Sequence, residues 1–124
     1  MTQSFVIHGK LPSLNEVIDA NRANPRAGAK LKRKVQSDIG WAIHHFNLRP
    51  MEGPVSVSIE WHEPNRRRDV DNITSAVKFI LDALVSCGVL DGDSQRYVPQ
   101  PPVNHVSIDT FHPRIVVTLE EVRP

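Results

Sequence analysis

Residues 55–62 of this chain, Val-Ser-Val-Ser-Ile-Glu-Trp-His, alternate strictly between apolar and polar side chains. Successive side chains of a β-strand point to opposite faces of a sheet, so this alternation predicts a strand over Val55–His62. One face of the strand is apolar and the other is polar. No other segment of the chain has so clear a strand pattern.

The remaining elements are predicted from spacing and from turn residues. Apolar residues recur at intervals of three and four over Lys30–Asn47 and over Asn72–Ser86, which predicts two amphipathic helices. Ser4–Leu11 predicts a further strand, and Val103–Thr110 with Arg114–Glu121 predicts a β-hairpin. Ser13–Gly28 contains several asparagines and a proline, and it predicts a long irregular loop that contacts substrate.

This order of elements predicts a single α/β or α+β domain over residues 1–124, with a mixed sheet and two main helices. A hydrophobic fraction of 40% and a charged fraction of 23% exclude a disordered or fibrous chain. No apolar run is long enough to cross a bilayer, and residues 1–5 lack a signal-peptide pattern. We therefore expect a cytoplasmic protein with no membrane partner.

Positive and negative side chains are segregated along the sequence. Residues 1–68 hold 11 Lys and Arg against 6 Asp and Glu, whereas residues 69–124 hold 4 against 8. Nine of the first eleven cations lie in two clusters, which are Arg22, Arg26, Lys30, Lys32, Arg33 and Lys34, and then Arg66, Arg67 and Arg68. Such clusters suit a polyanion whose phosphates must be neutralised, and a solvated charged surface is the alternative.

Asp69 and Asp71 lie between the predicted strand at Val55–His62 and the helix that follows it. Alternate residues of extended backbone point the same way, so these two carboxylates could converge on one cation. Oxygen ligands suit Mg²⁺, with Mn²⁺ as a substitute. Asp93, in the turn beyond the second helix, is the leading candidate for a third carboxylate.

Each of these acidic residues also has a structural interpretation. Asp71 or Asn72 is a good N-cap, Asp69 can close a turn, and Asp91-Gly92 is an ordinary turn dipeptide. The three arginines directly before the acid pair favour a phosphodiester held beside a metal ion over a cap.

Lys78 is a candidate member of the same site. On one continuous helix from Asp71, residues 71, 75, 78 and 82 lie within about 60° of one another, so Lys78 could reach the end with the acids. The alternative is an ordinary ion pair between Lys78 and Asp82, four residues further on.

Several other reaction classes are excluded by missing motifs. The six histidines show no His-Glu-x-x-His pattern, and Cys87 is the single cysteine, so a zinc hydrolase is not expected. The chain also lacks a glycine-rich phosphate loop and a Gly-x-Ser-x-Gly nucleophile elbow.

Three blocks of this sequence resemble RusA-like Holliday junction resolvases, many of which are carried by phages and prophages. The blocks are Arg68–Ile73 with Asp-Val-Asp-Asn, Lys78–Leu84 with Lys-Phe-Ile-Leu-Asp-Ala-Leu, and Gly88–Asp93 with Gly-Val-Leu-Asp-Gly-Asp. Asn15 belongs to a Pro-x-x-Asn segment that is similar to one near the start of that family. The enterobacterial members carry their lysine where this chain has Ser75.

The resemblance implies a homodimeric, Mg²⁺-dependent endonuclease that cuts four-way DNA junctions symmetrically in recombination and repair. Asp69, Asp71 and Asp93 would match the essential aspartates, with Asp93 preferred over Asp91, and Lys78 would match the catalytic lysine. We expect Asn72 to cap its helix and support the site. The competing hypothesis is a non-catalytic nucleic-acid-binding or regulatory module whose acids are only caps and turn residues.

Overall fold

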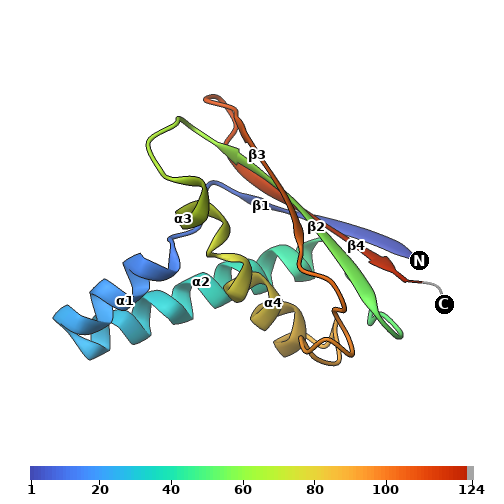
Figure 1. The fold of residues 1–124 in the computed structure, drawn as a ribbon. Helices are drawn as coiled ribbons and strands as arrows, with labels where there is room; N and C mark the ends of the chain where they lie inside the picture. Colours follow the sequence, from blue (N-terminus) through green and yellow to red (C-terminus); the bar gives the residue numbers. More distant parts are fainter. Residues whose placement is uncertain (123–124) are drawn as a thin grey trace.

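The computed structural model describes residues 1–122, which form a four-stranded sheet with helices on one side of it (Figure 1). The elements in chain order are β1 (Thr2–His8), α1 (Leu14–Ala23), α2 (Pro25–His45), β2 (Val55–Glu63), α3 (Val70–Thr74), α4 (Val77–Ser86), β3 (Val103–Ile108) and β4 (Arg114–Glu121). The predicted fold class is confirmed, since this is a single small α+β domain with a mixed sheet.

The strand order in the sheet is β1-β4-β2-β3. β4 lies antiparallel to both β1 and β2, whereas β3 lies parallel to β2. The first and third strands of the chain therefore form the two edges of the sheet, and β2 and β4 form its centre.

The hydrophobic core lies between the sheet and the helices. Val55, Val57, Ile59 and Trp61 of β2 are buried on the helix side, whereas Ser56 and Glu60 between them are exposed, as the alternation predicts. Ile115, Val117 and Leu119 of β4 continue this buried face. α2 and α4 cover the centre of the sheet with Val35, Ile39, Ile43, Phe79, Ile80, Ala83 and Leu84.

The predicted loop at residues 13–28 is wrong, because α1 and the first turn of α2 occupy this segment. Ser13 begins α1, and its hydroxyl accepts a hydrogen bond from the backbone N–H of Glu16 at 3.1 Å. Asn24 begins α2 by accepting from the N–H of Arg26, and Pro25 fills the first helical position. Serine, asparagine and proline begin helices here. The same residue types are common in loops, so their presence did not distinguish a helix start from a loop.

The single helix predicted over residues 72–86 is divided into α3 and α4. Ser75 and Ala76 separate the two helices, and the Ser75 hydroxyl donates to the carbonyl of Asn72 at 2.7 Å. The same hydroxyl accepts from the backbone N–H of Leu14 at the start of α1. This contact with α1 fixes the break, and the predicted continuous face from Asp71 to Asp82 is interrupted there.

The predicted β-hairpin is also wrong, although both of its strands form. β3 and β4 are separated by β2, which pairs with each of them. The buried side chains of β4 require a central position under the helices, whereas every residue of β3 is exposed and suits an edge. The connecting segment crosses the end of β2, where Asp109 N–H bonds the Glu63 carbonyl at 2.8 Å.

No helix within residues 1–122 is both long enough and apolar enough to span a bilayer.

Candidate functional site

An ion pair anchors the segment that leads from β2 to the predicted acid pair. The Arg68 guanidinium donates to both carboxylate oxygens of Glu63, at 3.0 and 2.9 Å, and to the Leu11 carbonyl at 2.8 Å. The side chains of Arg68 and Glu63 are only 15% and 3% exposed. Arg66 and Arg67 are exposed. Arg68 therefore fixes the backbone before Asp69, whereas the other two arginines face solvent.

Asp69 and Asp71 lie at the start of α3, and both are exposed. Asp69 occupies the N-cap position, but its side chain makes no capping hydrogen bond. The Asp71 carboxylate accepts a hydrogen bond from the N–H of the next residue, Asn72, at 3.1 Å. The predicted cap role of Asn72 is thus wrong, because the cap position belongs to Asp69. The Asp69 carboxylate is free of a capping bond and faces solvent.

Asn15 and Asn72 connect α1 to α3. The Asn15 amide donates to the Asn72 side-chain oxygen at 3.2 Å, beside the contact between Ser75 and Leu14. Both predicted supporting residues therefore meet, although they are far apart in sequence. The segment that contains α3 is therefore held against the start of α1.

Lys78 and Asp93, two of the predicted site residues, lie close to each other and apart from Asp69 and Asp71. The Lys78 ammonium lies 3.2 Å from Asp82 Oδ1 on its own helix and 3.9 Å from Asp93 Oδ2 on the loop after α4. Asp82 and Asp93 also line a groove of about 410 Å³ with Lys32 and Gln36 of α2. Asp91 is exposed and does not line this groove.

The predicted residues thus form two groups. Asp69 and Asp71 lie at the start of α3, and Asp93 lies with Lys78 and Asp82. Within residues 1–122, no three His, Cys, Asp or Glu side chains lie close enough to hold one metal ion together. Lys78 makes no ion pair with Asp69 or Asp71 in that part of the chain.

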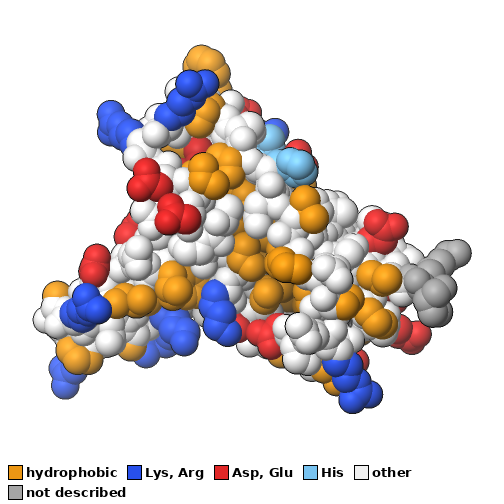
Figure 2. Space-filling model, in the orientation of Figure 1, with side chains coloured by type: hydrophobic (Ala, Val, Ile, Leu, Met, Phe, Trp, Pro, Cys, Tyr) orange, Lys and Arg blue, Asp and Glu red, His pale blue; other side chains and the backbone are white. Residues whose placement is uncertain are grey.

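The predicted cations surround the acidic residues. The six cations of the first cluster lie on α1 and α2, and all are exposed. Figure 2 shows Lys and Arg side chains at both ends of the concave left edge of the molecule, over the loop after β2 and over α1 and α2. Asp and Glu side chains lie between them. This edge presents an acidic centre with a cationic margin on each side.

Two residues of the site were not predicted from the sequence. Glu63 continues the alternation of β2 by one step beyond Trp61, which places its carboxylate on the buried face. A buried carboxylate requires a cationic partner. The extension of the alternation to Glu63 could therefore have predicted its pair with Arg68. Asp82 was considered only as a partner of Lys78, and nothing local indicated that Asp93 would join them.

No protein-family model matches this chain, and no curated protein matches it either.

Proposed function

We propose that this protein is a Mg²⁺-dependent endonuclease of the RusA-like type that cuts four-way junctions and other branched DNA. The observation that carries the proposal is the contact of Lys78 with Asp93 at 3.9 Å. Two residues that are fifteen positions apart, and that the resemblance assigns to one site, lie together in the folded chain. The groove beside them also contains Lys32 of the basic helix α2.

Asp69 and Asp71 are the proposed ligands of one Mg²⁺ ion, and Asp93, which lies apart from them with Lys78, would hold a second ion. Mg²⁺ commonly keeps several waters and takes only one or two protein carboxylates together with substrate phosphates, so exposed aspartates are suitable donors. Asp69 and Asp71 fit this requirement because both are exposed and the Asp69 side chain makes no capping bond. When bound, Mg²⁺ supplies an activated water and stabilises charge on the scissile phosphate.

Lys78 and the arginine loop have separate proposed roles. An ammonium beside the site favours the extra negative charge that develops on the phosphate, and Lys78 is the cation next to Asp93. Arg66, Arg67 and the cluster on α1 and α2 bind DNA phosphates on the two sides of the acidic centre. Arg68 contributes by positioning Asp69, because Glu63 and the Leu11 carbonyl occupy its donors.

A homodimer is part of the proposal, because two symmetric cuts require two copies of the site. The edge strand β3 supports it. Val103, Val106 and Ile108 of β3 are 57%, 36% and 42% exposed, and the outer edge of the strand has no neighbour within residues 1–122. We expect light scattering to give the mass of a dimer at assay concentrations. A monomer under cleavage conditions would contradict this part of the proposal.

The nuclease activity is tested by incubating the protein with labelled four-way junction, fork and linear duplex, with Mg²⁺ or with EDTA. We expect cleavage of branched DNA that requires Mg²⁺, and loss of cleavage without loss of binding for Asp71→Asn. Asp19→Asn, at an exposed acid on α1, is the matched control and should cleave normally. Comparing Asp93→Asn with Asp91→Asn decides which of the two residues is needed.

Each outcome of this experiment has a distinct meaning. If the wild-type protein binds junctions but leaves them intact across divalent ions and pH, the nuclease proposal fails and a DNA-binding module remains. If all three substrates are cut at equal rates, only the preference for branched DNA fails.

A further inference from the structure

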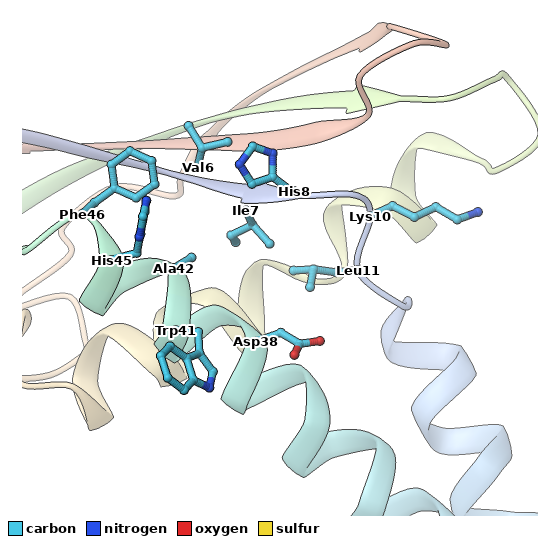
Figure 3. A pocket seen from close by; sticks show the side chains of 10 residues that line it. All are labelled: Val6, Ile7, His8, Lys10, Leu11, Asp38, Trp41, Ala42, His45 and Phe46. Atoms are coloured by element: carbon cyan, nitrogen blue, oxygen red, sulfur yellow. The ribbon is translucent and has the colours of Figure 1, made fainter.

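A cavity of about 440 Å³ lies between β1 and the C-terminal half of α2, outside the candidate active site. Trp41, His45 and Phe46 form its wall on the α2 side, with His8 of β1 opposite (Figure 3). Lys10, in the loop after β1, lines the end of the cavity, and its side chain extends away from the three rings.

Two of the aromatic rings that line this cavity are exposed to solvent. Trp41 is 71% exposed and Phe46 is 41% exposed, whereas the other tryptophan, Trp61, is fully buried. Leaving a large apolar ring in water forfeits the stabilisation that its burial would give the fold. A ring that the fold does not bury remains available to stack on a ligand.

The cavity continues toward the candidate active site. A second cavity of about 320 Å³ shares Lys10, Leu11 and Asp38 with the first and extends to Lys34 and Arg68. Arg68 directly precedes Asp69 in the chain. Lys34 and Trp41 also lie on nearly the same side of α2, because seven residues are close to two helical turns. One groove thus leads from the segment before Asp69 to Trp41.

The charges along this groove leave Lys10 without an ionic partner among the described residues. Lys10, Lys34 and Arg68 face the acids Glu16 and Asp38, and Arg68 is also paired with Glu63, so the groove as a whole has no net positive charge. Asp38 is neutralised by Lys34 at 2.8 Å, and Glu16 lies 3.9 Å from Arg68. Lys10 makes no ion pair with any residue that the structure describes. Its ammonium is free to bind a phosphate.

We propose that this groove binds a single-stranded DNA arm, with an unpaired base stacked on Trp41 and backbone phosphates beside Lys10. Stacking platforms combined with cationic grooves are the usual means of holding single strands. Duplex DNA does not fit this description, because its base faces are already stacked on each other. The inference rests on the proposed function and deepens it, since it makes the preferred substrate a branched DNA with a single-stranded arm.

Trp41 itself reports on the binding. An oligothymidylate of about ten nucleotides, within the site sizes of known single-strand binders, is titrated into the protein while tryptophan fluorescence is recorded. We expect quenching of Trp41, because Trp61 is buried and inaccessible to the oligonucleotide. Fluorescence anisotropy of a labelled oligonucleotide then measures affinity in the variants. Trp41→Ala should weaken binding about tenfold, the effect of losing one stacked base.

Three controls separate stacking from general attraction. Phe111→Ala removes an aromatic ring that is 98% exposed and outside the groove, and it should leave the affinity unchanged. An abasic oligonucleotide of the same length should bind as weakly as the natural oligonucleotide binds to Trp41→Ala. Lys10→Gln should weaken both oligonucleotides equally. Circular dichroism checks that Trp41→Ala remains folded, as expected for an exposed position.

The proposal is overturned if Trp41→Ala binds the oligothymidylate as tightly as wild type does. It is also overturned if an acidic peptide binds in the groove more tightly than the oligonucleotide, since the groove would then be a protein-docking site. The nuclease proposal can fail separately. A wild type that cuts no DNA but binds the oligonucleotide through Trp41 refutes only the nuclease, whereas a nuclease without this binding refutes only the groove.

Discussion

Lys78 makes the ion pair that the sequence left as the alternative to a place beside Asp71, together with one contact that the sequence did not indicate. It forms the ordinary ion pair with Asp82, four residues further along α4, and it also approaches Asp93. Because its side chain is 62% exposed, these contacts contribute little to stability, and an exposed pair is worth at most about 1 kcal/mol. The contacts of Lys78 therefore do little to stabilise the fold, and its replacement tests the proposed role in catalysis without unfolding the protein.

Replacing Lys78 should therefore affect chemistry more than binding. We expect Lys78→Gln to lower kcat for junction cleavage by about 10²-fold or more, the usual effect of losing one charge-stabilising group, with little change in KM. Lys34→Gln is the matched control, because Lys34 also forms an exposed i,i+4 pair, with Asp38. That variant should raise KM and leave kcat unchanged. Equal kcat values for both variants would contradict the role of Lys78.

Glu63 and Arg68 form an ion pair that is largely shielded from solvent, because Glu63 is buried and the Arg68 side chain is only 15% exposed. Removing one partner of a buried pair leaves the other charge without compensation, which costs about 3–5 kcal/mol. We expect Glu63→Gln to lower the free energy of unfolding in urea by about this amount. Glu60→Gln, on the exposed face of the same strand, should change it by less than about 0.5 kcal/mol. A small effect at both positions would show that Arg68 finds another partner.

Two carboxylates outside the candidate site should make the free energy of unfolding depend on pH. The Arg114 guanidinium, 2.8 Å from Asp109, is the main cause of the lowered pKa of Asp109. The backbone N–H of Glu52, followed by the N-terminal ammonium, lowers the pKa of Glu121. A carboxyl with a lowered folded pKa stabilises the fold above its unfolded pKa, and this contribution is lost as the pH falls through the folded pKa.

The free energy of unfolding should accordingly decrease as the pH falls from about 5 toward 2, the range in which such carboxyls take up protons. Urea unfolding at a series of pH values measures this slope. The double variant Asp109→Asn and Glu121→Gln should have a shallower slope than wild type. An unchanged slope would assign the acid sensitivity to other groups.

The helices α1 and α2 pack closely because Gly28 allows it. A Cβ at Gly28 would lie 2.6 Å from the Cα of Asn21 on α1, which is too close for any backbone to tolerate without moving. The pair of helices that carries the first cationic cluster thus depends on a residue without a side chain. Gly40 also lies in α2, but a Cβ there would be 3.8 Å from Cys87 Sγ, an ordinary contact.

Gly28→Ala and Gly40→Ala should therefore have opposite effects. We expect Gly28→Ala to force α1 away from α2 and to destabilise the protein by about 1–3 kcal/mol, with weaker binding to junction DNA. Gly40→Ala gains the helix propensity of alanine, up to about 1 kcal/mol, without a clash. Thermal unfolding and junction-binding titrations measure both. Equal Tm values for the two variants would contradict the close contact at Gly28.

Most helices and strands were predictable because their patterns are local. The alternation at Val55–His62 and the helical spacing within Lys30–Asn47 both depend on near neighbours, and both correspond to observed elements. The beginning of α2 was missed because Asn24 and Pro25 favour loops and helix starts alike. The break at Ser75 was missed because it depends on Leu14, which lies on another helix.

For the molecule as a whole, the cations on both sides of the acidic centre should make DNA binding strongly salt-dependent. Each phosphate contact adds about −0.9 to the slope of log K against log salt. We expect the double variant Arg66→Gln and Arg67→Gln to reduce the magnitude of this slope by about two, since both arginines are exposed. The measurement is a junction-binding titration at several salt concentrations.

The comparison with Arg68→Gln identifies which arginines contact DNA. Arg68 already donates to Glu63 and to the Leu11 carbonyl, so its replacement should lower stability and leave the salt slope unchanged while the protein remains folded. If replacing each of the three arginines reduced the magnitude of the salt slope equally, Arg68 would have to leave its ion pair with Glu63 when DNA binds.

The residues of the candidate site could be predicted from the sequence, but their arrangement in space could not. The sequence identified Asp69, Asp71, Lys78 and Asp93 from residue type, spacing and resemblance, and it paired Lys78 with Asp82. It did not indicate that Asp93 would meet Lys78 while Asp69 and Asp71 lay apart at the start of α3. The break between α3 and α4 lies between Asp71 and Lys78, so these two residues do not share one continuous helix.

The sequence by itself determined the fold class, the strand at Val55–His62 and the separation of basic from acidic residues, because each follows from residue order over short distances. Only the tertiary structure decided that β2 separates β3 from β4, that Arg68 forms an ion pair with Glu63, and that Trp41 borders a groove leading toward Asp69. The physical reason is that these features depend on which distant segments share the buried interior, and a local pattern contains no information about its partner.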